Sequence, residues 1–121
     1  MARERHKIKF QISDKVVNTT EAIAQYQDVP AQTVQVNAWR LGVLWVSFDQ
    51  FIGESIEPIE LEGEELPQVS ITVPEVQYQR LCNIAEAVNL RVSEMNQICL
   101  CRGVEILRRV TAFEQKISEV G

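Results

Sequence analysis

Three cysteines and one histidine are the side chains best suited to nucleophilic or metal chemistry. The odd number of cysteines argues against a disulfide framework. Cys99 and Cys101 stand two apart in a stretch with helical spacing, so they point to different faces and do not readily share a metal ion. We interpret them and Cys82 as small core hydrophobes. His6 stands among basic residues and is expected to be a solvated side chain.

Carboxylates are the other candidates for chemistry. Seven acids and no base fall between Asp49 and Glu65, a segment that also holds Gly53, Pro58 and Gly63. Such a cluster in a flexible segment does not make a tuned pair of catalytic carboxylates. The sequence also lacks a glycine-rich phosphate loop and metal-ligand spacing. We therefore expect no catalytic residues, no metal and no cofactor, and we expect that the chain is not an enzyme.

The net charge of −5 disfavours binding to nucleic acid, but the charge is unevenly distributed. Setting aside the seven clustered acids changes −5 to +2. The first thirteen residues carry Arg3, Arg5, Lys7 and Lys9 against Glu4, a local charge of +3. Residues 1–6 are thus predicted to be a basic N-terminal arm.

Length and composition indicate a soluble globular chain. It has 121 residues, of which 45% are hydrophobic and 24% charged. No apolar run approaches the ~18 residues that span a bilayer. The charged N-terminus has no apolar core of the kind that signal peptides carry. We expect a cytoplasmic protein that does not bind a membrane.

The elements that position the polar residues follow from hydrophobic periodicity. Residues 7–13 alternate apolar and polar side chains, which predicts a half-buried strand. Helical spacing follows from Asp14 to about Gln27–Asp28, and Pro30 then opens a second helix that is expected to end near Val46. Residues 48–66 are interpreted as an acidic linker.

The same order then returns. Val69, Ile71 and Val73 alternate with polar residues, and Pro74 and Glu75 open a helix. A second helix from about Val92 is expected to reach 112–113, and residues 114–121 are predicted to be a frayed tail. Residues 8–46 align with 69–107 at an offset of 61 without a gap. The two units are 7–47 and 67–113.

A strand and two helices of ~40 residues bury too little surface to fold alone, and a lone strand leaves an unsatisfied edge. We therefore expect the two strands of one chain to pair and the helices to share a core. The predicted fold class is α+β, mainly helical, with a two-stranded antiparallel ribbon and about four helices. Further association of such pseudo-dimers into a homo-oligomer stays open.

The run Val69-Ser70-Ile71-Thr72-Val73-Pro74-Glu75, followed by a helix, a short turn and Ser93-Glu94, resembles the ribbon-helix-helix superfamily of the Arc and Met repressors. The resemblance covers both halves and implies that the ribbon enters the major groove of double-stranded DNA. It implies a DNA-binding transcriptional regulator, a repressor. The base-reading residues would be the outward strand positions: Lys7, Lys9, Gln11, Gln68, Ser70 and Thr72.

The resemblance also implies DNA backbone contacts from the start of each second helix, and the charge of the basic arm predicts further contacts to phosphate. These residues are Arg3, Arg5, Ala31, Gln32, Arg91, Val92 and Ser93. The chain departs from the family where Asp28 and Asn89 replace the usual turn glycine; both tolerate left-handed geometry. Gly42 and Gly103 lie inside predicted helices, which indicates a close helix crossing.

A protein-interaction module is the alternative function. In that interpretation the acidic linker docks a basic protein partner, as in antitoxins, or folds back over the basic arm, and the DNA-binding face is lost. The charge of −5 favours this alternative, whereas Lys7, Lys9 and the two arginines of the arm favour DNA.

Overall fold

The protein is described by a computed structural model that covers residues 4–63 and 66–120. Strand β1 (Arg5–Gln11) leads into helices α1 (Asp14–Gln27) and α2 (Ala31–Ile52). Strand β2 (Gln68–Pro74) leads into α3 (Glu75–Ala87) and α4 (Val92–Val120). The order β-α-α-β-α-α, the α+β class and the four helices agree with the sequence prediction.

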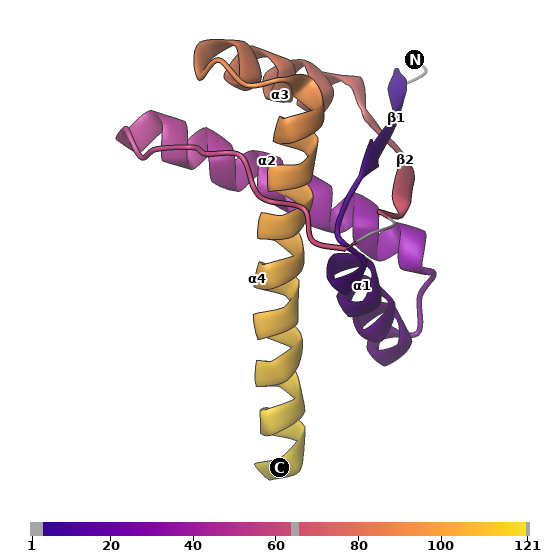
Figure 1. Cartoon of the computed structure of the whole chain (residues 1–121). Coiled ribbons are helices and arrows are strands. Elements are labelled where there is room, and N and C mark those ends of the chain that lie inside the picture. The colour runs from indigo at the N-terminus through magenta and orange to yellow at the C-terminus, as the bar shows by residue number, and fades with distance from the viewer. Residues whose placement is uncertain (1–3, 64–65, 121) are drawn as a thin grey trace.

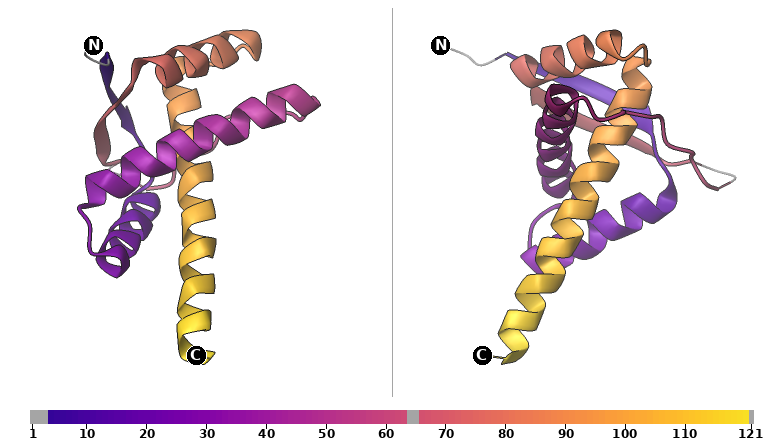
Figure 2. Two further views of the ribbon diagram at one scale, coloured as in Figure 1. Left: turned by 180° about the vertical axis from the view of Figure 1, so that it is seen from behind. Right: turned by 90° about the vertical axis from the view of Figure 1, so that its left-hand side faces the viewer.

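The two strands form one antiparallel ribbon, side by side in Figures 1 and 2. Ile8 faces Ile71, and Lys9 faces Ser70. Strand pairing within one chain is thereby confirmed. One face of the ribbon is apolar and at most 5% exposed; it consists of Ile8, Phe10, Val69, Ile71 and Val73. This face closes the core, which explains the alternation in the sequence.

The offset of 61 residues reappears in three dimensions. Helices α1 and α3 begin at Asp14 and Glu75, and α2 and α4 begin at Ala31 and Val92, 61 residues apart in both cases. Lys9 and Ser70, equivalent under the same offset, face each other across the ribbon. A residue can pair with its own equivalent only at a two-fold axis. The two halves are thus related by a pseudo-two-fold axis that passes between these residues.

The turns inside the two halves also match. Asp28 and Asn89 have φ angles of 56° and 59°, in the left-handed region that the sequence predicted for them. The N–H groups that follow bond to equivalent carbonyls: Val29 donates to Ala24 and Leu90 to Ala85, at 3.1 and 2.9 Å. Such bonds satisfy carbonyl groups that a helix end leaves open.

Helices α2 and α4 cross at the centre of the molecule (Figure 1). A Cβ atom built on Gly103 would lie 2.7 Å from the Cα of Ala38, and one on Gly42 would lie 2.6 Å from the Cα of Cys99. The two contacts are equivalent under the 61-residue offset. The close crossing predicted from the two glycines is therefore present, and each glycine packs on the other helix's backbone.

Several boundaries differ from those expected. Strand β1 begins at Arg5 because β2 extends to Pro74 and pairs with it, so Arg5 and His6 are not part of a free arm. Helix α2 continues to Ile52 and ends at Gly53, whose φ of 80° suits glycine. Helix α4 runs to Val120, beyond the end near 113 that we expected, since no glycine or proline lies between Phe113 and Val120.

The linker packs against the helices. Its apolar side chains Ile56, Ile59 and Leu61 are partly buried against the core, whereas Glu54, Glu57, Glu60 and Glu62 are exposed. The N–H of Glu62 donates to Ser13 Oγ at 2.9 Å, beside the end of β1. The described part of the linker therefore does not cover Lys7 and Lys9, which are exposed.

Candidate nucleic-acid interface

The outward face of the ribbon brings together the six side chains that the sequence placed there. Lys7 faces Thr72, Lys9 faces Ser70, and Gln11 faces Gln68. The lysines and glutamines are exposed, while Ser70 and Thr72 are half-buried. Because side chains alternate across a strand, none of them contributes to the core. Each can be replaced without opening the apolar face beneath.

The charge on this face is asymmetric. Arg5, Lys7 and Lys9 all come from β1. The outward positions of β2 carry no charge: Gln68, Ser70 and Thr72 offer an amide and two hydroxyl groups, and Pro74 offers no polar side chain. A ribbon of this kind combines three cations with amide and hydroxyl groups, which can both donate and accept hydrogen bonds.

Each edge of the ribbon is held by a glutamine from the second helix of a half. Gln32 in the first turn of α2 donates from Nε2 to the carbonyl of Ser70 at 3.2 Å. Gln97 of α4 donates to the carbonyl of Gln11 at 3.0 Å. Gln32, expected at a DNA backbone contact, thus also fixes β2. These bonds set the starts of α2 and α4 beside the ribbon.

The starts of α2 and α4 differ electrostatically. In the first turn of α2, which begins at Ala31, there is no acidic residue, and Pro30 makes no side-chain cap. At the start of α4, Glu94 accepts from the backbone N–H and from Nε of Arg91, at 3.0 and 3.1 Å. These two bonds lower the pKa of Glu94. A carboxylate therefore already occupies the positive end of the α4 dipole, which Val92 and Ser93 also line.

His6 is not the solvated residue that the sequence suggested. Its ring stacks on Tyr78 of α3, with centroids 3.8 Å apart. Its Nδ1 lies 3.1 Å from Glu75 Oε2. Hydrogen bonding by Gln79 is the largest cause of the lowered pKa of Glu75, and His6 adds to it. His6 thus ties the start of β1 to α3; no motif in the sequence links residues 69 positions apart.

Asp49 is a second residue that the sequence analysis misplaced. We counted it with the linker acids, but it lies in α2 and is 7% exposed. Its Oδ2 is 3.5 Å from a guanidinium nitrogen of Arg102 on α4. The pair joins the two crossing helices. The sequence predicted that α2 ends near Val46, so it did not indicate that Asp49 lies in this helix and pairs with Arg102.

The cysteines behave as the sequence predicted. Cys99 is fully buried at the helix crossing, and Cys82 and Cys101 are half-buried, all three as free thiols. Burial raises the pKa of Cys99, and it raises that of Cys101 to about 11. Neutral thiols of this kind are poor nucleophiles and metal ligands.

The described residues contain neither a cluster of metal-ligating side chains nor a helix that could span a membrane. Within 4–63 and 66–120, no group of three or more His, Cys, Asp or Glu side chains is arranged to hold a metal ion. Among the helices of those residues, none combines the length and apolar character needed to cross a membrane. Arg3, expected to contact the DNA backbone, lies outside the described residues.

Comparison with protein-family models, with curated proteins and with solved structures finds no match. The classification of the chain therefore depends on its own topology. Two β-α-α units, joined by an antiparallel pair of strands and a central helix crossing, have the architecture expected of tandem ribbon-helix-helix units.

Proposed function

We propose that the chain is a ribbon-helix-helix protein that binds specific DNA sequences and regulates transcription. The observation that carries the proposal is the outward ribbon face, where Lys7, Lys9, Gln11, Gln68, Ser70 and Thr72 stand together. A two-stranded ribbon fits the major groove, and these side-chain types can bond to base edges there. The cations of β1 add attraction for phosphate.

The pseudo-two-fold axis gives the proposed contacts a direction. Because Lys9 and Ser70 meet at the axis, the two halves of the ribbon present different chemistry to the two halves of a binding site. The lysines of β1 would donate hydrogen bonds to guanine. The glutamine amide and the two hydroxyl groups of β2 would distinguish between bases in the other half of the site. The proposed target is therefore a site without two-fold sequence symmetry.

The proposed phosphate contacts come from the helix starts. The N–H groups of Ala31 and Gln32 at the start of α2 would meet phosphate without a competing carboxylate in that turn. At α4, the backbone N–H groups of Val92 and Ser93 would share the site with Glu94. Arg91 is 80% exposed and would supply the cation on that side.

The test is selection of a preferred duplex from random sequences, then titration of the chain against that duplex and a scrambled one at two salt concentrations. Lys9→Ala should weaken specific binding and reduce the salt slope by about one. Thr72→Ala should reduce discrimination between the duplexes by roughly 1–3 kcal/mol. Arg5→Ala should weaken binding to both duplexes by similar factors.

Lys116→Ala is the matched control, because it removes a lysine from the far end of α4, distant from the ribbon (Figure 1). It should leave both titrations unchanged. If the wild type binds neither duplex below ~10 μM at low salt, where even non-specific binders associate, the proposal is wrong.

A second candidate is an interaction module that binds a basic protein through the linker. The observation in its favour is that Glu54, Glu57, Glu60 and Glu62 are exposed while the intervening apolar side chains hold the segment in place. A row of fixed carboxylates suits a cationic partner. Replacing these four glutamates with glutamine should abolish such binding and leave DNA binding intact or stronger.

A further inference from the structure

Helix α4 continues past the rest of the fold and leaves an apolar stripe without a partner. In Figures 1 and 2 its C-terminal part runs away from the ribbon and from the other helices. Every residue from Ala112 to Val120 is exposed. Within this stretch Phe113 is 64% exposed and Ile117 is 55% exposed.

The spacing of the stripe is that of a coiled coil. Apolar residues recur at intervals of four, three, four and three: Ile106, Val110, Phe113, Ile117 and Val120. This is the a/d pattern of a heptad repeat, with Val110 and Ile117 at a. The a positions thus carry the β-branched side chains that parallel two-stranded coiled coils prefer there, while Ile106, Phe113 and Val120 replace the usual leucine at d. An ordinary surface helix would carry polar residues here, so the repeat calls for a partner helix of the same kind.

The flanking charges select the orientation. In this register Arg109 and Lys116 occupy g positions and Glu114 occupies an e position. In a parallel pair, Arg109 of one helix faces Glu114 of the other, and symmetry makes the contact twice. In an antiparallel pair, g would face g and e would face e, which brings like charges together.

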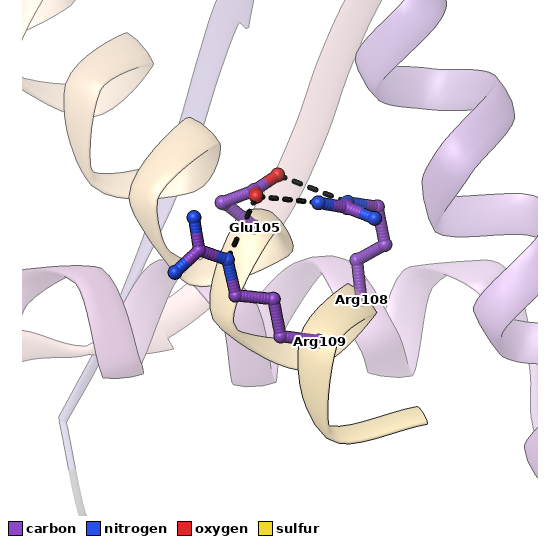
Figure 3. Close-up of polar contacts among 3 residues, drawn as sticks. All are labelled: Glu105, Arg108 and Arg109. Atoms are coloured by element: carbon purple, nitrogen blue, oxygen red, sulfur yellow. Dashed lines mark hydrogen bonds and ion pairs between the residues drawn. The ribbon is translucent and has the colours of Figure 1, made fainter. Parts of the chain in front are cut away.

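Arg109 also bonds within its own helix, to Glu105 one turn earlier in α4. Glu105 Oε1 accepts from Arg109 Nε at 3.1 Å and from Arg108 at 2.6 Å (Figure 3). These bonds lower the pKa of Glu105 to about 2, Arg108 being the largest cause, so the carboxylate is ionised near neutral pH. The Arg109 side chain is still 76% exposed and has other N–H groups available for a second carboxylate.

We propose that two copies of this chain associate through residues 106–120 of α4 as a parallel two-stranded coiled coil. The proposal goes beyond DNA binding and does not depend on it. The nine residues 112–120 at the end of α4 are all exposed, so little tertiary packing holds them helical, and pairing would stabilise them. With only two heptads the interface is small, so the association should be weak and depend on the protein concentration.

Sedimentation equilibrium of the full chain, from ~1 to ~200 μM, tests the association. The wild type should pass from the monomer mass of 13.8 kDa to twice that value. Phe113→Glu combined with Ile117→Glu should stay monomeric, because charges at a and d would be buried without partners. Both residues are exposed in the monomer, so its melting temperature should not fall.

Phe51→Glu is the matched control, because Phe51 is 86% exposed on α2, outside the proposed seam. It should dimerise like the wild type. A wild type that stays monomeric at 200 μM, or a double variant that still dimerises, would overturn the proposal; loss of dimer in Phe51→Glu would move the interface to α2.

Charge exchange tests the parallel orientation. Arg109→Glu alone and Glu114→Arg alone should each weaken the dimer by roughly tenfold, because two attractive contacts become repulsive. An equal mixture of these two variants should regain the wild-type affinity, since each Arg then faces a Glu of the other chain. If the single variants associate as tightly as the wild type, the parallel register is wrong.

Discussion

Adding one methyl group at the helix crossing provides the sharpest test of the fold. The Cβ of a Gly103→Ala variant would lie 2.7 Å from the Cα of Ala38, against 3.4–4 Å for ordinary contact, and closer still to the carbonyl of Ala38. Backbone cannot rotate away as a side chain can, and the carbonyl oxygen of Ala38 is the nearest atom, so α2 and α4 must separate by more than ~1 Å at this point.

Two opposing effects set the result. Alanine is a better helix former than glycine by roughly 1 kcal/mol. Overpacking costs typically 1–3 kcal/mol, and a backbone clash belongs at or above the upper end of that range. Separation of the helices would also loosen the packing of Trp39, Val43 and Leu100, which are at most 1% exposed. We therefore expect a net loss of at least ~2 kcal/mol, which lowers the melting temperature by roughly 8 °C or more.

Thermal denaturation followed by circular dichroism measures the effect. Asn18→Ala, on the exposed face of α1, is the control for helix propensity and should leave the melting temperature equal or slightly higher. Gly42→Ala should resemble Gly103→Ala, and the double variant should lose less than the sum, because both methyl groups push the same helices apart. If Gly103→Ala melts at or above the wild-type temperature, the close crossing is refuted.

Three further predictions concern the core, the pH response and the thiols. Asn96→Ala should destabilise the protein by about 1–3 kcal/mol in urea titrations, because it removes the buried acceptor 2.9 Å from Trp39 Nε1 and leaves that N–H unpaired; equal stability would mean that water replaces the amide. The depressed pKa of Glu105, about 2, means that its contribution is present above its unfolded pKa near 4.5 and lost as the pH falls toward 2. Glu105→Gln should therefore reduce the loss of melting temperature over that window, and an unchanged pH profile would contradict this. Cys99 should be the last thiol alkylated at pH 8, as followed by mass spectrometry, because it is buried with a raised pKa; early labelling would show that the crossing opens.

The sequence predicted the elements whose signals are local. Alternation around Ile8 and Ile71 located both strands, and the left-handed turns were anticipated from Asp28 and Asn89. Gly42 and Gly103 indicated the crossing because glycine inside a helix needs a packing reason. The alternation of apolar and polar residues also placed the six outward strand residues on one face. Their role in binding DNA stays a prediction.

What the sequence did not show depends on contacts between distant segments. His6 looked solvated because its partners, Glu75 and Tyr78, are about 70 residues away. Asp49 was assigned to the linker because it is the first of the clustered acids and α2 was expected to end near Val46. We expected α4 to end near residue 113 because polar residues surround its last apolar side chains. A frayed tail can have the same pattern of residues.

The ribbon also has a consequence for how the protein is made. Ile8 and Phe10 of β1 find their partners Ile71 and Val69 only after about 60 further residues have been synthesised. At ~5–20 residues per second, the apolar face of β1 waits roughly 3–12 s for β2 to leave the ribosome. During that interval the first half cannot complete a core of its own, so β1 has an unpaired edge, which is the feature most prone to pair with another chain. The two lysines and the arginine on the outward side of β1 are charges of the kind that protect such an edge while the nascent chain is incomplete.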